Sequence, residues 1–239
     1  MRRAPAYARS TSRRRPWDPS DLLGPAGECI ERPPQDALAR LRPLLVNDME
    51  TEFDGQFLMR HVEALPFELS EPARLAFEEW NADEAQHYAG FRTALEVLFD
   101  DAERDFEALQ RRAPDFGPLA SVFEDEFRLL LLGAYDELCT VRGYRGNLDL
   151  YDRLGVPFGD FVRRVIADEA RHYSLFLGVL RERYAARRAE APAIIAEIRA
   201  LEGTPYAQTF VLDHDDAELY TGAVCDQAAR ILHRQFVER

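Results

Sequence analysis

One acid-rich decapeptide occurs twice in the chain, as ADEAQHYAGF at 82–91 and as ADEARHYSLF at 167–176. The copies agree at seven of ten positions and start 85 residues apart. Each holds a Glu-x-x-His motif, whose two side chains share one face of a helix and suit a first-row transition metal. A single copy is typical of a solvated helix surface, so it is the repetition that favours metal binding. The motif pairs are Glu84 with His87 and Glu169 with His172.

A further glutamate precedes each motif at the same distance. The resulting pairs are Glu52 with Glu84 and Glu137 with Glu169, each 32 residues apart. In an antiparallel hairpin of helices, both members of such a pair reach the same height when the turn lies at their midpoint, which is residue 68 or 153. Proline and glycine breaks lie there, at 66–72 and 153–157. The sequence therefore predicts two hairpins that bring all these side chains together.

Two Glu-x-x-His helices and one glutamate from each of two other helices form the di-iron carboxylate site of helical bundles. We therefore expect two iron ions, as Fe2+ or Fe3+, with manganese as an alternative in one position. The predicted metal ligands are Glu52, Glu84, His87, Glu137, Glu169 and His172.

An aspartate stands directly before each motif glutamate, at Asp83 and Asp168. Metal-bound imidazoles usually donate their second N–H to a carboxylate, which fixes the tautomer. We expect Asp168 to support His87 in this way, and Asp83 to support His172. The alternative is that both aspartates are ordinary exposed acids of a helix surface.

Helical periodicity with proline and glycine breaks dominates the sequence. Apart from a few residues near 209–212, no stretch alternates as a strand would. We therefore expect an all-α fold, a four-helix bundle with accessory N- and C-terminal helices. The long runs are 35–64, 71–99, 118–142 and 158–189, and the shorter ones are 100–113, 148–153, 193–202 and 215–237.

The chain is expected to form a single bundle domain with additions at both ends. Residues 1–32 read as a disordered basic tail, because the first seventeen residues hold six arginines and no acid. An Arg-rich transit peptide is the alternative for this tail. Residues 33–191 form the bundle, and 192–239 form accessory helices of the same domain.

Composition excludes several function classes. The net charge of −13 argues against nucleic-acid binding, and no apolar run is long enough to cross a membrane. No lysine is present, which excludes Schiff-base chemistry. The three cysteines are far apart and form no CxxC pair, which favours a reducing, cytoplasmic location.

The motifs resemble those of the soluble acyl-(acyl carrier protein) desaturases, which are ferritin-like di-iron proteins. LVNDMETE at 45–52 is similar to their LVGDMxTEE, WNADEAQH at 80–87 to their W-x-A-E-E-x-x-H, and ADEARH at 167–172 to their A-D-E-K-R-H. The resemblance spans residues 45 to about 180 and implies a ferritin-like bundle. The chain is shorter than those desaturases and its third helix keeps little of their pattern, so the long acyl substrate and the carrier protein are less well supported than the metal site.

Three further residues are candidates for roles in catalysis. Thr140 falls where the desaturases have a threonine beside the oxygen-binding face; alternatively, its hydroxyl bonds a backbone carbonyl. Trp80, one turn before Glu84, is a candidate for electron transfer or for the substrate channel, with plain core packing as the alternative. Tyr144, seven residues after Glu137, is a weaker channel or radical candidate.

The expected function is a dioxygen-dependent di-iron oxidoreductase, of the desaturase or hydroxylase type. Its substrate would be an acyl chain or another small organic molecule, free or bound to a carrier protein. An external electron donor such as ferredoxin is required, and a homodimer is expected. One alternative is a di-iron N-oxygenase of amines, although Val165 stands where those enzymes have an additional histidine ligand. The others are ferritin- or rubrerythrin-like handling of iron or peroxide, and a radical-generating subunit.

Overall fold

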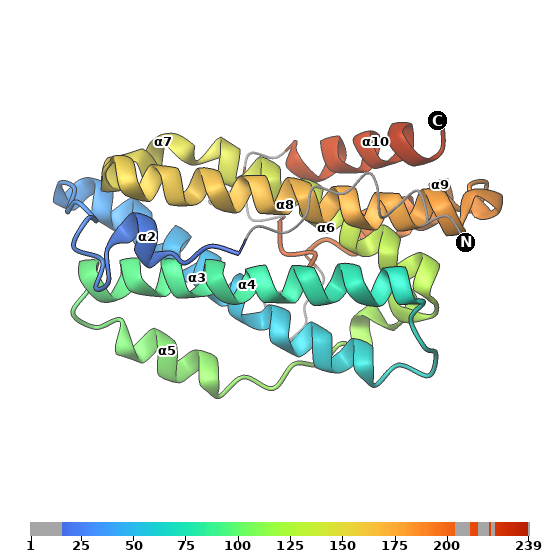
Figure 1. The fold of residues 1–239 in the computed structure, drawn as a ribbon, viewed down its shortest axis with the longest axis horizontal. Helices are drawn as coiled ribbons and strands as arrows, with labels where there is room; N and C mark the ends of the chain where they lie inside the picture. The colour runs from blue at the N-terminus through green and yellow to red at the C-terminus, as the bar shows by residue number, and fades with distance from the viewer. Residues whose placement is uncertain (1–15, 204–210, 215–219, 221–222, 239) are drawn as a thin grey trace, which may run out of the picture.

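The structure is a computed structural model that describes residues 16–203, 211–214, 220 and 223–238, all of them in helices, turns or loops and none in a strand (Figure 1). This agrees with the expected all-α fold. The α-helices are α2 (Ser20–Leu23), α3 (Gln35–Glu63), α4 (Glu71–Leu98), α5 (Glu103–Gln110), α6 (Glu126–Gly146), α7 (Leu148–Tyr151), α8 (Val156–Arg183), α9 (Ala191–Ala200) and α10 (Val224–Phe236). Short 3-10 helices are η1 (Gly117–Phe123), η2 (Asp152–Leu154) and η3 (Ala185–Arg187).

The long helices form a helical bundle built from two hairpins. Helix α3 packs chiefly against α4, and α6 against α8, while contacts between α4 and α8 join the hairpins. All of them run along the long axis of the molecule in Figure 1. The breaks at 64–70 and 147–155 separate the two arms of each hairpin, close to the midpoints that the glutamate spacing predicts.

The third helix differs from its prediction at both ends. Residues 117–123 form η1, and α6 begins only after Asp125, whose carboxylate accepts a hydrogen bond from the Arg128 N–H at 2.8 Å. The helix then continues through 143–146, where glycines were expected to end it. A Cβ at Gly143 would lie 2.7 Å from the ring of Tyr220, so this glycine permits close packing within the helix instead of stopping it.

The expectation of a disordered tail over residues 1–32 is wrong for residues 16–32. This segment contains α2 and buries Leu23 and Ile30 in the bundle core. All six N-terminal arginines precede residue 16, so the described part of the segment has apolar anchors and little positive charge. Residues 1–15 lie outside the described part of the chain.

The C-terminal helices pack on the bundle. Helix α9 lies against α6, and α10 contacts α6, α8 and α9. Of the helix predicted at 215–237, the structure describes residue 220 and 223–237, in which α10 begins at Val224. Residues 215–219 and 221–222 lie outside the described residues.

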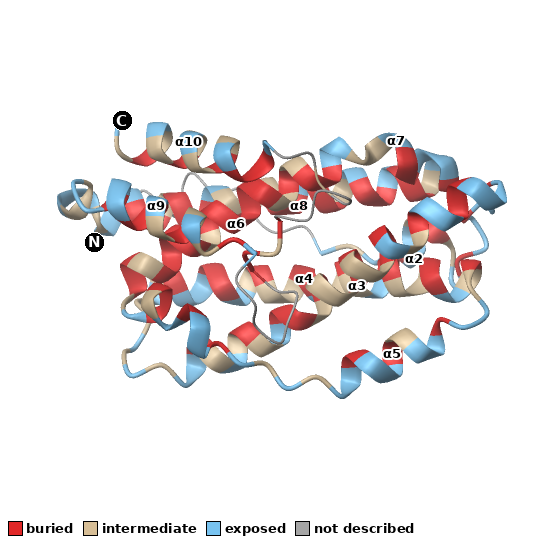
Figure 2. Cartoon of the chain, turned by 180° about the vertical axis from the view of Figure 1, so that it is seen from behind, coloured by how far each residue is buried: buried red, intermediate tan, exposed pale blue. Residues whose placement is uncertain are grey.

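The apolar core is interrupted midway along the bundle. Buried positions follow the inward sides of the long helices (Figure 2). These apolar residues fall into two clusters, and on α3 Met49 belongs to one while Leu58 belongs to the other. Glu52 lies between them. Among the described residues, no helix combines the length and apolar character that crossing a bilayer requires.

Candidate metal centre

The structure brings the predicted ligands together where the apolar core is interrupted. Helix α3 supplies Glu52, α4 supplies Glu84 and His87, α6 supplies Glu137, and α8 supplies Glu169 and His172. Each of these side chains is buried. They form two groups that could each hold a metal ion, and the groups share Glu169.

Glu169 lies between the two imidazoles. Its Oε1 is 3.0 Å from Nδ1 of His87, and its Oε2 is 2.7 Å from Nδ1 of His172. Glu84 Oε1 also faces both rings, at 3.9 Å from His87 Nδ1 and 3.6 Å from His172 Nδ1. These carboxylates from opposite hairpins are therefore candidates to bridge two ions.

The remaining two glutamates each face a single imidazole. Glu52 Oε2 lies 3.2 Å from Nδ1 of His87, and Glu137 Oε2 lies 3.5 Å from Nδ1 of His172. Each group thus combines one imidazole with one terminal carboxylate. In both histidines Nδ1 points into the cluster, which makes Nδ1 the candidate ligand atom.

Nε2 of each histidine points toward an aspartate of the opposite hairpin. His172 Nε2 is 3.2 Å from Asp83 Oδ2, and His87 Nε2 is 3.7 Å from Asp168 Oδ2. This is the crosswise pairing that the sequence suggests. An N–H on Nε2 leaves Nδ1 as the free electron pair, so these carboxylates favour the tautomer that a metal ion needs.

Two residues that hold the aspartates were not predicted. The guanidinium of Arg171 pairs with Asp83 and lies 3.4 Å from Asp168 Oδ1. The indole N–H of Trp17 donates to Asp168 Oδ2 at 2.7 Å. Arg171 occupies one of the three positions at which the decapeptides differ. That difference is the one feature of the sequence that could have indicated its role. Trp17 lies in the segment assigned to a tail, where nothing in the sequence pointed to the site.

The buried oxygen atoms of the cluster fit a bound cation. Glu84 Oε1, Glu137 Oε2 and Glu169 Oε1 are buried and make no hydrogen bond with good geometry to any described residue. An unsatisfied buried polar group costs about 1–3 kcal/mol, and more when it is charged. Four carboxylates around two imidazoles also leave an excess of negative charge. The donor set of oxygen and imidazole nitrogen suits first-row divalent ions.

The pKa values of the cluster residues reflect the same excess of carboxylates over imidazoles. Burial, with Glu169 next, raises the pKa of Glu84 and of Glu137 well above the usual range. Burial works against the charged form of His87 and His172, but the surrounding glutamates outweigh it and raise the pKa of both. Glu169 is the exception, because the two imidazoles overcome its burial and lower its pKa. Without a metal ion, protons hold this cluster together.

No protein-family model, no curated protein and no solved structure matches this chain. The resemblance to the desaturases therefore rests on the motifs quoted above.

The three candidates for catalysis lie in different surroundings. The hydroxyl of Tyr144 donates to Glu52 Oε1 and so contacts the cluster directly. Trp80 is buried in the apolar core, and a Cβ at Gly55 would lie 3.2 Å from its ring. The hydroxyl of Thr140 donates to the Asp136 carbonyl at 3.1 Å and lies 3.3 Å from His214 Nε2. Thr140 therefore makes the alternative contact that the sequence left open.

Proposed function

We propose that this protein is a dioxygen-dependent di-iron oxidoreductase with a ferritin-like four-helix bundle. The observation that carries the proposal is the position of Glu169, whose two oxygens face the Nδ1 atoms of both histidines. A paired site for two ions needs a shared carboxylate of this kind. A single-metal site would not explain why both hairpins contribute the same ligands.

Each residue of the cluster has a defined part in this proposal. When bound, a pair of reduced iron ions supplies the Lewis acidity and the electrons for dioxygen reduction. Glu52 and His87 would hold one ion, and Glu137 and His172 would hold the other. The shared carboxylates, Glu84 and Glu169, face both positions. The supporting aspartates keep each imidazole in the Nδ1-ligating tautomer.

Tyr144 is proposed to hold a proton at the edge of the cluster. Its hydroxyl donates to Glu52 Oε1, and burial raises its pKa well above the usual range. The tyrosine therefore stays protonated and keeps its hydrogen bond to Glu52. This positions the Glu52 carboxylate for its ion.

The reaction balances only with an external electron donor. The substrate gives up two electrons, from one C–H bond in hydroxylation or from two adjacent C–H bonds in desaturation; the donor supplies two more electrons with two protons, and dioxygen is fully reduced. Hydroxylation places one oxygen atom in the product and releases one water, whereas desaturation releases two waters. A ferredoxin-type protein is the proposed donor, because the cluster itself returns to its starting state.

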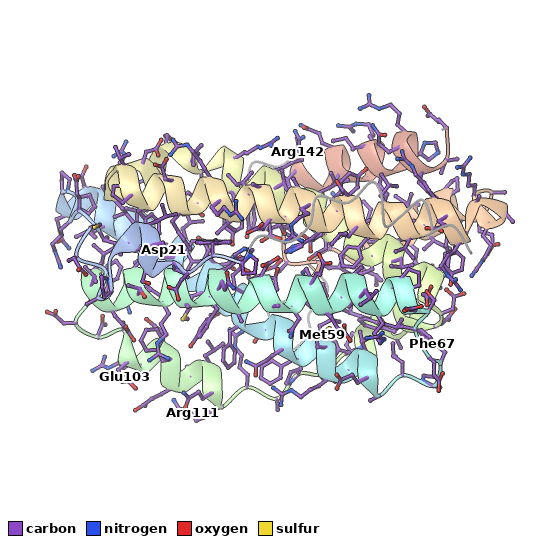
Figure 3. All side chains as sticks on the ribbon, viewed as in Figure 1. Asp21, Met59, Phe67, Glu103, Arg111 and Arg142 are labelled. Carbon is purple, nitrogen blue, oxygen red and sulfur yellow. The ribbon has the colours of Figure 1, made fainter. Side chains whose placement is uncertain are left out.

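A groove at the turn between α3 and α4, lined by apolar side chains and by charged ones at its rim, is the proposed entry for an acyl chain or another small organic molecule as substrate. Its lining includes Met59 and Phe67, which Figure 3 labels near this end of the bundle, together with Phe77. The ring of Phe77 lies 6.1 Å from that of Trp80, one helical turn before Glu84. Because these rings lie between the groove and Glu84, the proposal places the route of an apolar substrate along them.

The test is product formation by the iron-loaded protein. With reduced ferredoxin and dioxygen, acyl substrates in free and carrier-bound form are supplied, and products are identified by mass spectrometry. We expect one organic product per dioxygen consumed for the wild type and for Glu96→Ala, an exposed control on α4 that lies outside the groove. Glu84→Ala should form none.

Other outcomes would contradict the proposal. An iron mineral without organic product indicates ferritin-like storage, and peroxide reduction alone indicates rubrerythrin-like activity. Oxidation confined to the nitrogen of aryl amines indicates an N-oxygenase. A stable tyrosyl radical without turnover indicates a radical-generating subunit.

A further inference from the structure

A second group of metal-binding side chains lies on another face of α6. It consists of Cys139 on α6, Glu202 directly after α9, and His214 in the described segment 211–214. All three are buried, and their candidate ligand atoms lie within 4.8 Å of one another. Cys139 stands two positions after Glu137, about 200° around the helix axis. The group therefore faces away from the cluster described above.

The carboxylate of Glu202 is held by hydrogen bonds at both oxygens. The Tyr135 hydroxyl donates to Oε1 at 2.7 Å, and the His214 backbone N–H donates to Oε2 at 3.1 Å. The Cys139 sulfur lies 4.0 Å from the same Oε1. Carboxylates that bind metals are typically oriented by such outer hydrogen bonds. Glu202 is thus fixed beside the thiol before any ion binds.

The imidazole of His214 is buried without a full set of partners. Its Nδ1 makes no hydrogen bond to any described residue, although its side chain is only 3% exposed. The acids Asp213 and Asp136 lie near Nδ1, at 3.5 and 3.8 Å, and Asp213 Oδ1 also makes no hydrogen bond. His214 Nδ1 and Asp213 Oδ1 therefore make no hydrogen bond with good geometry to a described residue, and unsatisfied buried polar atoms of this kind are costly.

We propose that Cys139, Glu202 and His214 bind a divalent cation of the zinc class, independently of the di-iron site. Thiolate and imidazole ligands favour Zn2+ over Mg2+ or Ca2+, which prefer oxygen alone. Bonds of about 2.3 Å to sulfur and 2.1 Å to oxygen in a tetrahedral site set these atoms about 3.6 Å apart. The observed 4.0 Å between Cys139 Sγ and Glu202 Oε1 therefore needs only a small adjustment.

The ion would fasten the C-terminal part of the chain to the bundle. Its ligands come from α6, from the end of α9 and from the segment that precedes α10. That segment also contacts α6 through the Leu212 N–H, which donates to Asp136 Oδ1 at 3.0 Å, and through the Thr140 hydroxyl, 3.3 Å from His214 Nε2. Structural zinc sites contribute directly to folding stability. We therefore assign the ion a structural role.

Cobalt provides a probe that reports this site alone. A thiolate bound to Co2+ gives a charge-transfer absorption band, and the di-iron cluster contains no cysteine. The experiment uses full-length, reduced, metal-free protein with Cys29→Ser, because Cys29 is an exposed thiol. Co2+ is added in this background alone, with Cys139→Ser, and with Cys225→Ser. Circular dichroism checks that each variant is folded.

Cys225 is the matched control for Cys139. It is equally buried and lies in the same region, where its Sγ donates to the His214 carbonyl at 3.5 Å. The proposal predicts a thiolate band whose final intensity corresponds to one thiolate-bound Co2+ per chain, which persists in Cys225→Ser, disappears in Cys139→Ser, and is lost when Zn2+ displaces the Co2+. Absence of the band in the parent protein, its persistence in Cys139→Ser, or its equal loss in both variants would overturn the assignment.

Discussion

The α3–α4 and α6–α8 hairpins supply the same ligands to the cluster, and residues 85 positions apart can be compared directly. Where the first hairpin has Gly55 and Trp80, the second has Thr140 and Val165. In the first, the indole fills the space that the missing Cβ leaves. In the second, both side chains are of intermediate size. Metal binding would constrain the ligands alone, so the neighbouring side chains could differ between the halves.

The aspartates that face the two imidazoles are also held by different residues in the two hairpins. Asp83 lies closer to His172 than Asp168 lies to His87, and it pairs with the guanidinium of Arg171. The position that matches Arg171 in the first hairpin is Gln86. Asp168 lies 3.4 Å from Arg171 and 3.7 Å from Arg164, and it also accepts a hydrogen bond from the indole of Trp17, from outside the repeat. The aspartate that faces His87 is therefore the one that the N-terminal segment helps to hold.

The largest expected effect is on metal content, and it distinguishes a carboxylate that faces both imidazoles from one that faces a single imidazole. Glu169→Ala removes a carboxylate that contacts both imidazoles, so we expect the variant to lose both metal ions. Glu52→Ala removes a carboxylate that faces only one imidazole, that of His87, and the variant should lose one ion. Iron content per folded chain, determined after reconstitution and desalting, measures this. Equal loss in the two variants would contradict the shared role of Glu169.

The supporting aspartates should contribute unequally. We expect Asp83→Asn to weaken Fe2+ binding about 100-fold and Asp168→Asn only about 10-fold, the two ends of the range for such partners. The physical reason is the shorter distance between Asp83 and His172. Competition with a coloured chelator gives both affinities. A larger effect of Asp168→Asn would reverse the comparison.

Metal-free protein should lose stability as the pH rises. The pKa values of Glu84, Glu137, His87 and His172 are raised in the folded state. Above the unfolded values of about 4.3 for Glu and 6.5 for His, the folded chain therefore binds more protons than the unfolded chain. The free energy of unfolding should fall between about pH 5 and pH 8.

Glu169 works in the opposite sense, because its lowered pKa contributes stability that is lost as the pH falls below about 4. Urea unfolding in the presence of a chelator measures the trend. Bound metal ions replace the protons, so the decline with pH should be much smaller in the loaded protein. A metal-free protein that becomes more stable toward pH 8 would contradict this account of the cluster.

The smallest expected effect concerns the link to the N-terminal segment. Trp17→Phe keeps an aromatic ring beside Phe161 but removes the hydrogen bond to Asp168. A hydrogen bond to a charged group contributes about 1.5–3 kcal/mol, so urea unfolding should show a loss in that range. Iron should still bind at both positions. A loss of all metal would mean that the indole has a larger part in the site than its single contact indicates.

The sequence was sufficient to predict the two helical hairpins and the group of side chains that they bring together. Equal spacing of the glutamates, with breaks at both midpoints, determines which side chains reach the same height, and these are local features of a helical hairpin. Helix ends were harder to predict. Gly143 was expected to end α6, but it permits the close approach of Tyr220, which lies 77 residues away in sequence.

Contacts between distant segments could not be predicted. Trp17 reaches Asp168 across 151 residues, and no periodic pattern records such a contact. The same holds for the second group, because Cys139, Glu202 and His214 share no motif spacing. Their proximity depends on how α9 and the segment at 211–214 fold back onto α6.

The most direct test of the central claim is the iron content of the reconstituted protein together with its Mössbauer spectrum. The account predicts two irons per chain, magnetically coupled, and their loss in Glu84→Ala. One iron or none, unchanged by that substitution, would contradict it, and the repeated decapeptide would then be a structural repeat without a metal centre.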